Sequence, residues 1–270
     1  MLRRRKSRIS TTDNLDAEHF LKAFSAKIDG VRSSTAFAPD PLFTDLNADV
    51  GLHVFEPVDA TTVLRLVNQV PNKNCELDPV PTWPVKQFSG DLSSFIARLF
   101  NASFHDGVFP TSQKCAVVTP VLKKTTLDPL DRSNYRPITN VTFMSKLLER
   151  CAHTQLYGYL QQHDLLPEQQ SAYRCCHSTE TAMLKVLSDV YSEADAGDVT
   201  PLSLFDLSAA FDSVDHQILI ERLQRTFGVR GRALDWLPSY LSGRTQFVRY
   251  CGATSTVASL SCGVTQRSVV

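Results

Sequence analysis

The sequence has 270 residues, of which 43% are hydrophobic and 21% are charged, an ordinary globular composition that suits one large domain or two smaller ones. Lysine and arginine total 28, as do aspartate and glutamate, so net charge does not indicate a nucleic-acid partner and any basic surface must be local. No apolar run is long enough to cross a bilayer, which argues against a membrane-spanning protein.

Cysteine usage favours a reduced intracellular compartment, nuclear or cytoplasmic. The seven cysteines are odd in number and form no CxxC pair, and no apolar segment follows the basic start of the chain. The adjacent Cys175-Cys176-His177 suggests a metal at first sight. Neighbouring residues rarely chelate one ion without distant partners, so we favour the interpretation without a metal.

The chain opens with a basic segment, MLRRRKSR, that contains Arg3, Arg4, Arg5, Lys6 and Arg8. Such a segment is typical of a nuclear-targeting or RNA-contacting arm, and equally of a solvated tail. Both interpretations stay open. An apolar face then predicts a helix over residues 13–29, and Pro, Asn and Asp predict loops over 33–43 and 71–84.

The remaining elements follow from hydrophobic periodicity and from the residues that end helices. We expect helices over 56–70, with Val63, Leu66, Val67 and Val70 inward, and over 91–101, 145–163, 178–197, 212–228 and 232–243, the last interrupted at Pro238. Strands are expected in CAVVTPVLKK (115–124) and PLSLFDL (201–207), and a hairpin over 244–264 that turns near Gly252. This order of elements predicts an α+β fold rather than a doubly wound parallel sheet.

Three acids lie in or beside the apolar stretch LSLFDLSAAFDSVDH (202–216). Asp212 and Asp215 flank the expected helix start, where acids cap free N–H groups and meet the positive end of the helix dipole. Asp206 closes the expected buried strand. It either holds Mg²⁺, which prefers anionic oxygen, or pairs with a basic neighbour. The pattern leaves both open.

The stretch DLSAAFDSVDH resembles motif A of reverse transcriptases from non-LTR (LINE-type) retrotransposons, particularly the Jockey and chicken-repeat groups. Other stretches agree with that family in order, from about residue 50 to the end of the sequence: CELDPVPTWPVK, FPTSQKCAVVTPVLKK, SNYRPITNVTFMSKLLER, QQSAYRCCHSTETAML and WLPSYLSGRTQFV. The resemblance implies a right-hand polymerase with fingers and an incomplete palm, and no thumb. It divides the chain into a basic arm and linker helix (1–50), an N-terminal extension and fingers (51–200), and a partial palm (201–270).

The resemblance also assigns expected roles to individual residues. Asp206 would be the first metal-binding carboxylate of the palm, for Mg²⁺, and Phe211 would block a ribose 2′-OH, although core packing would explain an aromatic there too. Lys123, Lys124 and Arg136 fall in fingers blocks, where fixed positive charge offsets the charge of an incoming triphosphate. The alternatives are a solvated charge run for the lysines and an ordinary ion pair for Arg136.

Two further assignments come from the same comparison. Arg174 follows QSAY and resembles a template-contacting position, or it is an ordinary surface arginine. Gln266 matches the glutamine of the family block GVPQGSVLGP, where this chain reads GVTQRSVV. Arg267 replaces a glycine at which only a residue without Cβ lets the backbone approach template and nucleotide closely. The Asp-Asp turn that follows in the family is not in this sequence.

The resemblance therefore implies a fragment of an RNA-directed DNA polymerase. The family adds deoxynucleotides to a DNA 3′-OH on an RNA template by two-metal catalysis, with template, primer and deoxynucleoside triphosphates as partners. Because the second metal-binding element is missing, we expect this chain to be inactive by itself. The alternatives are a non-catalytic nucleic-acid-binding remnant and a translated remnant without function.

Overall fold

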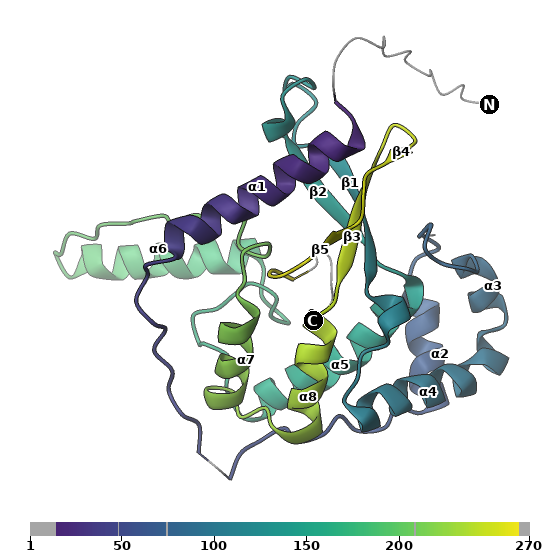
Figure 1. Ribbon diagram of the computed structural model, residues 1–270. Helices are drawn as coiled ribbons and strands as arrows, with labels where there is room; N and C mark the ends of the chain where they lie inside the picture. Colours follow the sequence, from purple (N-terminus) through teal and green to yellow (C-terminus); the bar gives the residue numbers. More distant parts are fainter. Residues whose placement is uncertain (1–14, 48, 74, 208, 265–270) are drawn as a thin grey trace. The chain divides into compact units, whose positions relative to one another are not determined.

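A computed structural model describes residues 15–47, 49–73, 75–207 and 209–264 of the chain (Figure 1). The basic arm at residues 3–8 and Gln266 lie outside the described residues. The chain is a mixed α and β structure that divides into two compact units. One comprises Met1–Leu156 with Ala209–Val270, and the other comprises Tyr157–Ser208. The expected α+β class is confirmed.

The larger unit contains a small mixed sheet with the strand order β2-β1-β3-β4, and β5 also pairs with β3. Strand β1 runs antiparallel to β2 and parallel to β3, so that Val118 lies opposite both Thr139 and Val248. The expected strand at 115–124 is therefore the centre of the sheet. The strands are β1 (Cys115–Leu122), β2 (Tyr135–Asn140), β3 (Thr245–Tyr250), β4 (Ala253–Thr254) and β5 (Ala258–Ser259).

The β3–β4 hairpin turns at Cys251 and Gly252, as predicted. Their φ angles are 48° and 87°, both in the left-handed region. A two-residue turn with two positive φ angles matches the right-handed twist of the strands that it joins.

Helix α1 (Ala17–Thr35) covers one face of this sheet (Figure 1). Its buried Phe20 ring lies 4.8 Å from the ring of Tyr135 and 4.7 Å from that of Tyr250. Burial raises the pKa of the Tyr250 hydroxyl. The helix begins later than expected because Asp16 accepts the N–H of His19 and caps it, and it extends further, to Thr35.

The rest of the larger unit is a helical core. The four residues predicted to face inward from the second helix, Val63, Leu66, Val67 and Val70, are all buried, which confirms that prediction. The expected helices at 91–101 and 145–163 are also present, with different ends. The helices of this core are α2 (Ala60–Gln69), α3 (Thr82–Gln87), α4 (Ser89–Asp106), α5 (Phe143–Gln162), α7 (His216–Arg225) and α8 (Gly231–Leu241); single 3-10 turns lie at Thr111–Gln113 and Arg132–Asn134.

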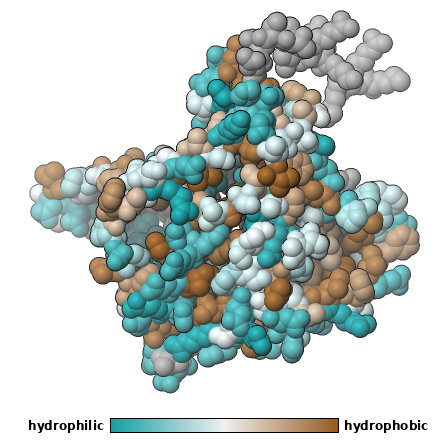
Figure 2. All heavy atoms as spheres, in the orientation of Figure 1, coloured by the Kyte–Doolittle hydropathy of each residue, from teal (hydrophilic) through white to brown (hydrophobic). Residues whose placement is uncertain are grey.

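The indole of Trp236 lies at the centre of this core. It stacks on Tyr240 with ring centroids 5.3 Å apart, and the edge of Phe109 meets it at 5.5 Å. Its Nε1 donates a hydrogen bond to Ser103 Oγ at 3.0 Å, so the buried indole nitrogen is satisfied. On the surface, apolar and polar residues are interspersed on the face drawn in Figure 2.

Two expected helices need correction. Helix α8 is not interrupted at Pro238 but continues to Leu241. Proline removes one hydrogen bond from the helix. That loss is offset by the burial of the side chains on both sides of Pro238, which are Trp236, Leu237, Tyr240 and Leu241. The helix expected over 212–228 covers only His216–Arg225. Asp215 is its cap and accepts the N–H groups of Gln217 and Ile218, as predicted, whereas Asp212 lies outside it.

The unit Tyr157–Ser208 contains helix α6 (Thr179–Asp195), which starts in a capping box between Ser178 and Thr181. The segment expected as a buried strand, residues 201–207, is neither a strand nor buried: Leu204 is 88% exposed and Phe205 is 92% exposed. A strand needs a hydrogen-bonded neighbour, and no strand in the described part of the chain pairs with this segment. Asp206 is consequently exposed.

A search of the described helices for a stretch both long and apolar enough to cross a membrane finds none.

One buried ion pair joins the helices to the sheet. Arg244, which immediately precedes β3, is 3% exposed and lies 3.5 Å from the fully buried carboxylate of Glu149 in α5. Arg244 Nε donates to the carbonyl of Tyr240, and the guanidinium lies 4.2 Å from the centre of the Tyr240 ring. Burial, and secondarily the charge of Arg244, lowers the pKa of Lys114 at the start of β1.

We predict that Arg244→Met lowers the free energy of unfolding by about 3–5 kcal/mol, because it leaves the Glu149 carboxylate buried without its cation. Adding Glu149→Gln removes that charge while keeping its shape, so the double variant should be more stable than Arg244→Met alone. Urea unfolding of the parent, both single variants and the double variant measures the coupling. Equal stability of Arg244→Met and the double variant would contradict a buried ion pair.

Candidate nucleotide and template site

The cations expected near a triphosphate gather at one end of the β1–β2 hairpin. Arg136 lies in β2 opposite Val121 of β1. Lys123 follows β1 directly: its N–H donates to the carbonyl of Asn134 at 2.9 Å, and its Nζ donates to the carbonyl of Ser133 at 2.8 Å. Lys124 is exposed and begins the loop. The backbone pairing therefore brings these three side chains into one region.

Arg136 faces away from α1. Tyr135 packs against α1, and Pro137 and Thr139 line a cavity with residues of the same helix. Because side chains alternate across a strand, the intervening Arg136 projects from the other face of the sheet. It is exposed, and the described residues offer it no ion pair. The alternative of an ordinary ion pair thus finds no support in the described part.

Acids in the same loop are held mainly by local hydrogen bonds. Asp131 accepts the N–H and the hydroxyl of Ser133 at 2.8 and 2.7 Å, and these hydrogen bonds lower the pKa of the Asp131 carboxyl. Asp128 accepts the N–H of Leu130 at 2.9 Å. These carboxylates shape the loop rather than forming salt bridges with Lys123 or Lys124.

A second feature joins two segments that are 50 residues apart in the sequence. Gly263 N–H donates to the carbonyl of Val214 at 2.7 Å, and Val264 N–H donates to the carbonyl of Phe211 at 2.8 Å. The ring Nε2 of His216 lies 2.7 Å from the Gly263 carbonyl oxygen. Phe211 is 46% exposed, so its side chain is not a core residue.

Only glycine fits at position 263. Its φ is 79°, and a Cβ there would lie 2.5 Å from the carbonyl oxygen of Asp212. Sequence reasoning did not single out Gly263 or His216. The glycine that opens GVTQ was the available signal, because a residue without a Cβ allows two backbone segments to approach closely.

The contact lies next to a small cavity of about 60 Å³. Its polar lining comes from Lys27 of α1, Thr139 of β2, Gln246 of β3 and Asp212, with Val264 beside them. Asp212, expected as a helix cap, thus lines a cavity instead. The chain continues from Val264 toward Gln266, which lies outside the described residues.

The other two predicted site residues belong to the unit Tyr157–Ser208. Arg174 Nη1 donates to the carbonyls of Pro167 and Glu168, at 3.1 and 3.2 Å, and so ties its own loop together. Asp206 is exposed in an irregular segment. In the described part of the chain, no group of three or more histidine, cysteine, aspartate or glutamate side chains could hold a metal ion. These donors do not by themselves fit a Mg²⁺ centre.

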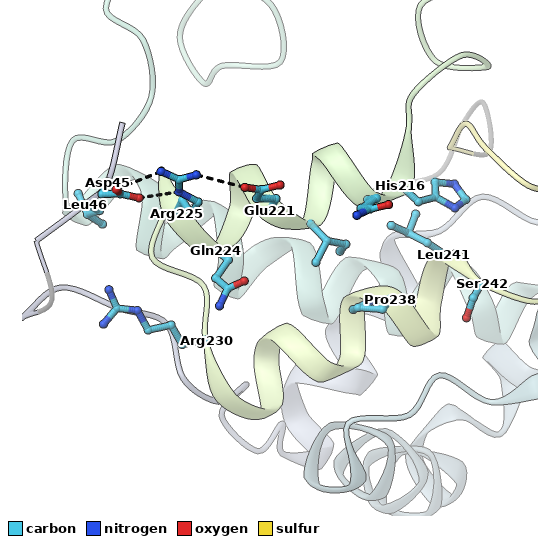
Figure 3. Close-up of a pocket in the computed structure, with 12 residues that line it drawn as sticks. Asp45, Leu46, His216, Glu221, Gln224, Arg225, Arg230, Pro238, Leu241 and Ser242 are labelled. Atoms are coloured by element: carbon cyan, nitrogen blue, oxygen red, sulfur yellow. Dashed lines mark hydrogen bonds and ion pairs between the residues drawn. The ribbon is translucent and has the colours of Figure 1, made fainter. Parts of the chain in front are cut away.

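A groove in the larger unit lies between α7 and α8, with Asp45 and Leu46 at its edge (Figure 3). Its volume is about 840 Å³, and the expected site residues do not line it. Arg225 in this groove binds Asp45 at 2.7 Å and Glu221 at 3.2 Å. The Asp45 and Glu221 hydrogen bonds raise the pKa of Arg225, and its charge is already compensated, so this arginine is a poor site for an anion.

The sequence matches a family model described as "Reverse transcriptase (RNA-dependent DNA polymerase)" over residues 121–266, more than half of the chain. The chain belongs to the reverse transcriptase family. The matched range contains Lys123, Lys124, Arg136, Arg174, Asp206, Phe211 and Gln266.

Two relatives of this reverse transcriptase chain are proteins of Drosophila melanogaster mobile elements. The chain is 28% identical over 233 residues to the probable RNA-directed DNA polymerase from transposon X-element, covering 86% of this chain and 25% of the relative. It is 25% identical over 218 residues to the RNA-directed DNA polymerase from mobile element jockey, covering 79% and 24%. The resemblance to LINE-type enzymes is confirmed, and the chain spans about a quarter of the length of these relatives.

We predict that Gly263→Ala destabilises this reverse transcriptase chain more than Gly252→Ala does. Both glycines have a left-handed φ, but a Cβ at Gly252 meets open space, whereas at Gly263 it meets the Asp212 carbonyl. Gly252→Ala, the control, should lower the free energy of unfolding by about 1–2 kcal/mol because of its left-handed φ alone. Gly263→Ala should lower it by about 1–3 kcal/mol more because of the overlap.

Urea unfolding measures this difference, and amide hydrogen exchange localises it. The Gly263 variant should lose protection of the Gly263 and Val264 amides, which donate to residues 214 and 211. Equal costs for the two variants would show that the contact between these segments is not formed.

Proposed function

We propose that this chain carries the fingers and part of the palm of a LINE-type reverse transcriptase. Its N-terminal arm and linker helix would be residues 1–50, its N-terminal extension and fingers 51–200, and its partial palm 201–270. In the complete enzyme these parts serve the addition of deoxynucleotides to a DNA 3′-OH on an RNA template, inside the cell, nuclear or cytoplasmic. The observation that carries the proposal is the clustering of Lys123, Lys124 and Arg136 on one hairpin within the family match.

The hairpin cations are proposed to bind phosphate. Arg136 would meet the incoming triphosphate, since its side chain is exposed on the face of the sheet away from α1 and its planar guanidinium suits phosphate oxygens. Lys123 and Lys124 add positive charge at the same end of the hairpin. Fixed charge at this position offsets the charge of the triphosphate without rearrangement.

Phe211 is proposed to select deoxynucleotides by excluding a ribose 2′-OH. Its half-exposed ring and its backbone contact with Val264, which lies two residues before Gln266 in the sequence, support this role. Gln266 is proposed to contact the nucleotide, and Arg174 the template. The hydrogen bonds from Arg174 to residues 167 and 168 would hold its loop in one conformation for that purpose.

Asp206 is proposed as one metal-binding carboxylate of the complete polymerase. Magnesium supplies charge neutralisation in such enzymes, and several carboxylates must hold it. Since the described residues bring no further acids into a metal-binding group with Asp206, we propose that this chain does not polymerise by itself. The same observation favours a second candidate function, nucleic-acid binding without catalysis.

The hairpin cations can be tested by binding to an RNA template annealed to a DNA primer. We predict that the triple variant Lys123→Gln/Lys124→Gln/Arg136→Gln binds more weakly. It should also lower the magnitude of the slope of log affinity against log salt by about 2–3, because each phosphate contact that is lost no longer releases a counterion on binding. Fluorescence anisotropy at several salt concentrations measures both quantities.

The matched control removes the same charge elsewhere on the larger unit, as Lys22→Gln/Arg65→Gln/Arg98→Gln on α1, α2 and α4. It should leave most of the affinity and slope intact. Equal loss in the two triple variants would indicate a diffuse charge effect, and an unchanged slope in the hairpin variant would contradict the proposed site.

A further inference from the structure

Two adjacent thiols in the smaller unit differ from the other cysteines of the chain. Cys175 and Cys176 are both exposed, and their Sγ atoms lie 3.6 Å apart. Among the other five free cysteines, Cys75, Cys151 and Cys262 are buried. Burial raises the pKa of Cys151 to about 12, which leaves it a protonated, unreactive thiol. No pattern in the sequence predicted that the sulfurs of Cys175 and Cys176 lie on the same side of the chain.

The backbone holds the two sulfurs in this position. Cys176 has a φ of 62°, in the left-handed region. The N–H of Cys175 donates to Tyr157 Oη at 3.1 Å, and the N–H of His177 donates to the carbonyl of Arg174 at 3.3 Å. Helix α6 then begins in its capping box at Ser178. The turn is thus fixed on both sides by hydrogen bonds within the same unit.

The spacing of the sulfurs suits a single bridging atom. Two thiolates bound at about 2.3 Å to one tetrahedral centre lie about 3.8 Å from each other, close to the observed 3.6 Å. Zinc is a poor occupant, since its protein sites use three or four ligands and no group of three or more ligating side chains exists among the described residues. A soft centre that is satisfied by two sulfurs and one organic group fits better.

Space for that organic group lies beside Cys176. A depression of about 460 Å³ is lined there by Cys176, His177, Ala182, Lys185 and Val186, together with other residues of the same unit. Lys185 in this lining is paired with Asp189 at 2.5 Å, so the depression offers space rather than a free positive charge. The contact with the Cys175 sulfur raises the pKa of the Cys176 thiol.

We propose that Cys175 and Cys176 form a vicinal dithiol site that captures trivalent organic arsenicals. For an arsenoxide, two S–H bonds and the As=O bond break, two S–As bonds form, and the oxygen leaves with both protons as water. No electron is transferred, so no oxidant is required. The resulting ring contains both sulfurs and the peptide bond between the residues. This site is independent of the proposed polymerase function.

The test is capture of phenylarsine oxide by the full chain, followed by a challenge with excess monothiol and intact-mass measurement. A single-sulfur adduct exchanges with the monothiol, whereas the ring is retained until a small dithiol is added. The parent chain should keep one arsenical per chain. Cys175→Ser and Cys176→Ser should each lose it, while Cys251→Ser, which removes another exposed thiol, should keep it.

Serine at either exposed position leaves the fold unchanged, and circular dichroism of each variant checks this. Retention of the arsenical by Cys175→Ser or Cys176→Ser would overturn the proposal. So would complete loss from the parent chain under the monothiol challenge, or loss from Cys251→Ser equal to that of the two vicinal variants.

Discussion

The larger unit depends on the buried Arg244–Glu149 pair, because it fixes where the sheet meets the helices. Arg244 Nε binds the carbonyl of Tyr240 at the end of α8, its charge faces Glu149 of α5, and its backbone carbonyl accepts the N–H of Leu260. Strand β3 starts at the next residue and runs parallel to β1. A charge buried this deeply is tolerated only with its partner and the Tyr240 ring in place. The position of the β1–β2 hairpin, and therefore of its cations, follows from that arrangement.

A backbone contact lies beside Phe211, which belongs to the proposed site in the larger unit. Gly263 and Val264 pair with Val214 and Phe211, and the absence of a Cβ at Gly263 is what allows two chain segments to lie so close together. The Arg244–Glu149 pair is an electrostatic constraint inside the core. The contact at Gly263 is a steric constraint, because a Cβ at this position would overlap the Asp212 carbonyl. Asp206 belongs to neither, since it lies exposed in the other unit.

Local patterns in the sequence predicted the elements that local forces determine. The apolar stripe of α2 predicted four residues that are all buried, and the turn near Gly252 was placed correctly because glycine favours the left-handed φ that such a turn needs. The prediction of a strand at 201–207 was wrong, because a strand needs a neighbouring strand to pair with and the residues of the segment itself cannot reveal one. Pro238 lies within α8 because packing around Trp236 outweighs the missing N–H. For the site, the family resemblance assigned Lys123, Lys124 and Arg136 a role that stays a prediction, and the structure places them on one hairpin. The contact at Gly263 joins segments too distant in the sequence for local patterns to reveal.

We propose, as the central point, that this chain has the nucleotide-facing parts of a reverse transcriptase and that its described residues form no complete metal centre. Template-directed primer extension tests it most directly, with the parent chain and Asp206→Asn compared on an RNA template with a DNA primer, deoxynucleotides and Mg²⁺. We predict no incorporation above the no-enzyme control for either protein. Incorporation by the parent chain that Asp206→Asn abolishes would contradict the claim, because it would show a competent metal site at Asp206.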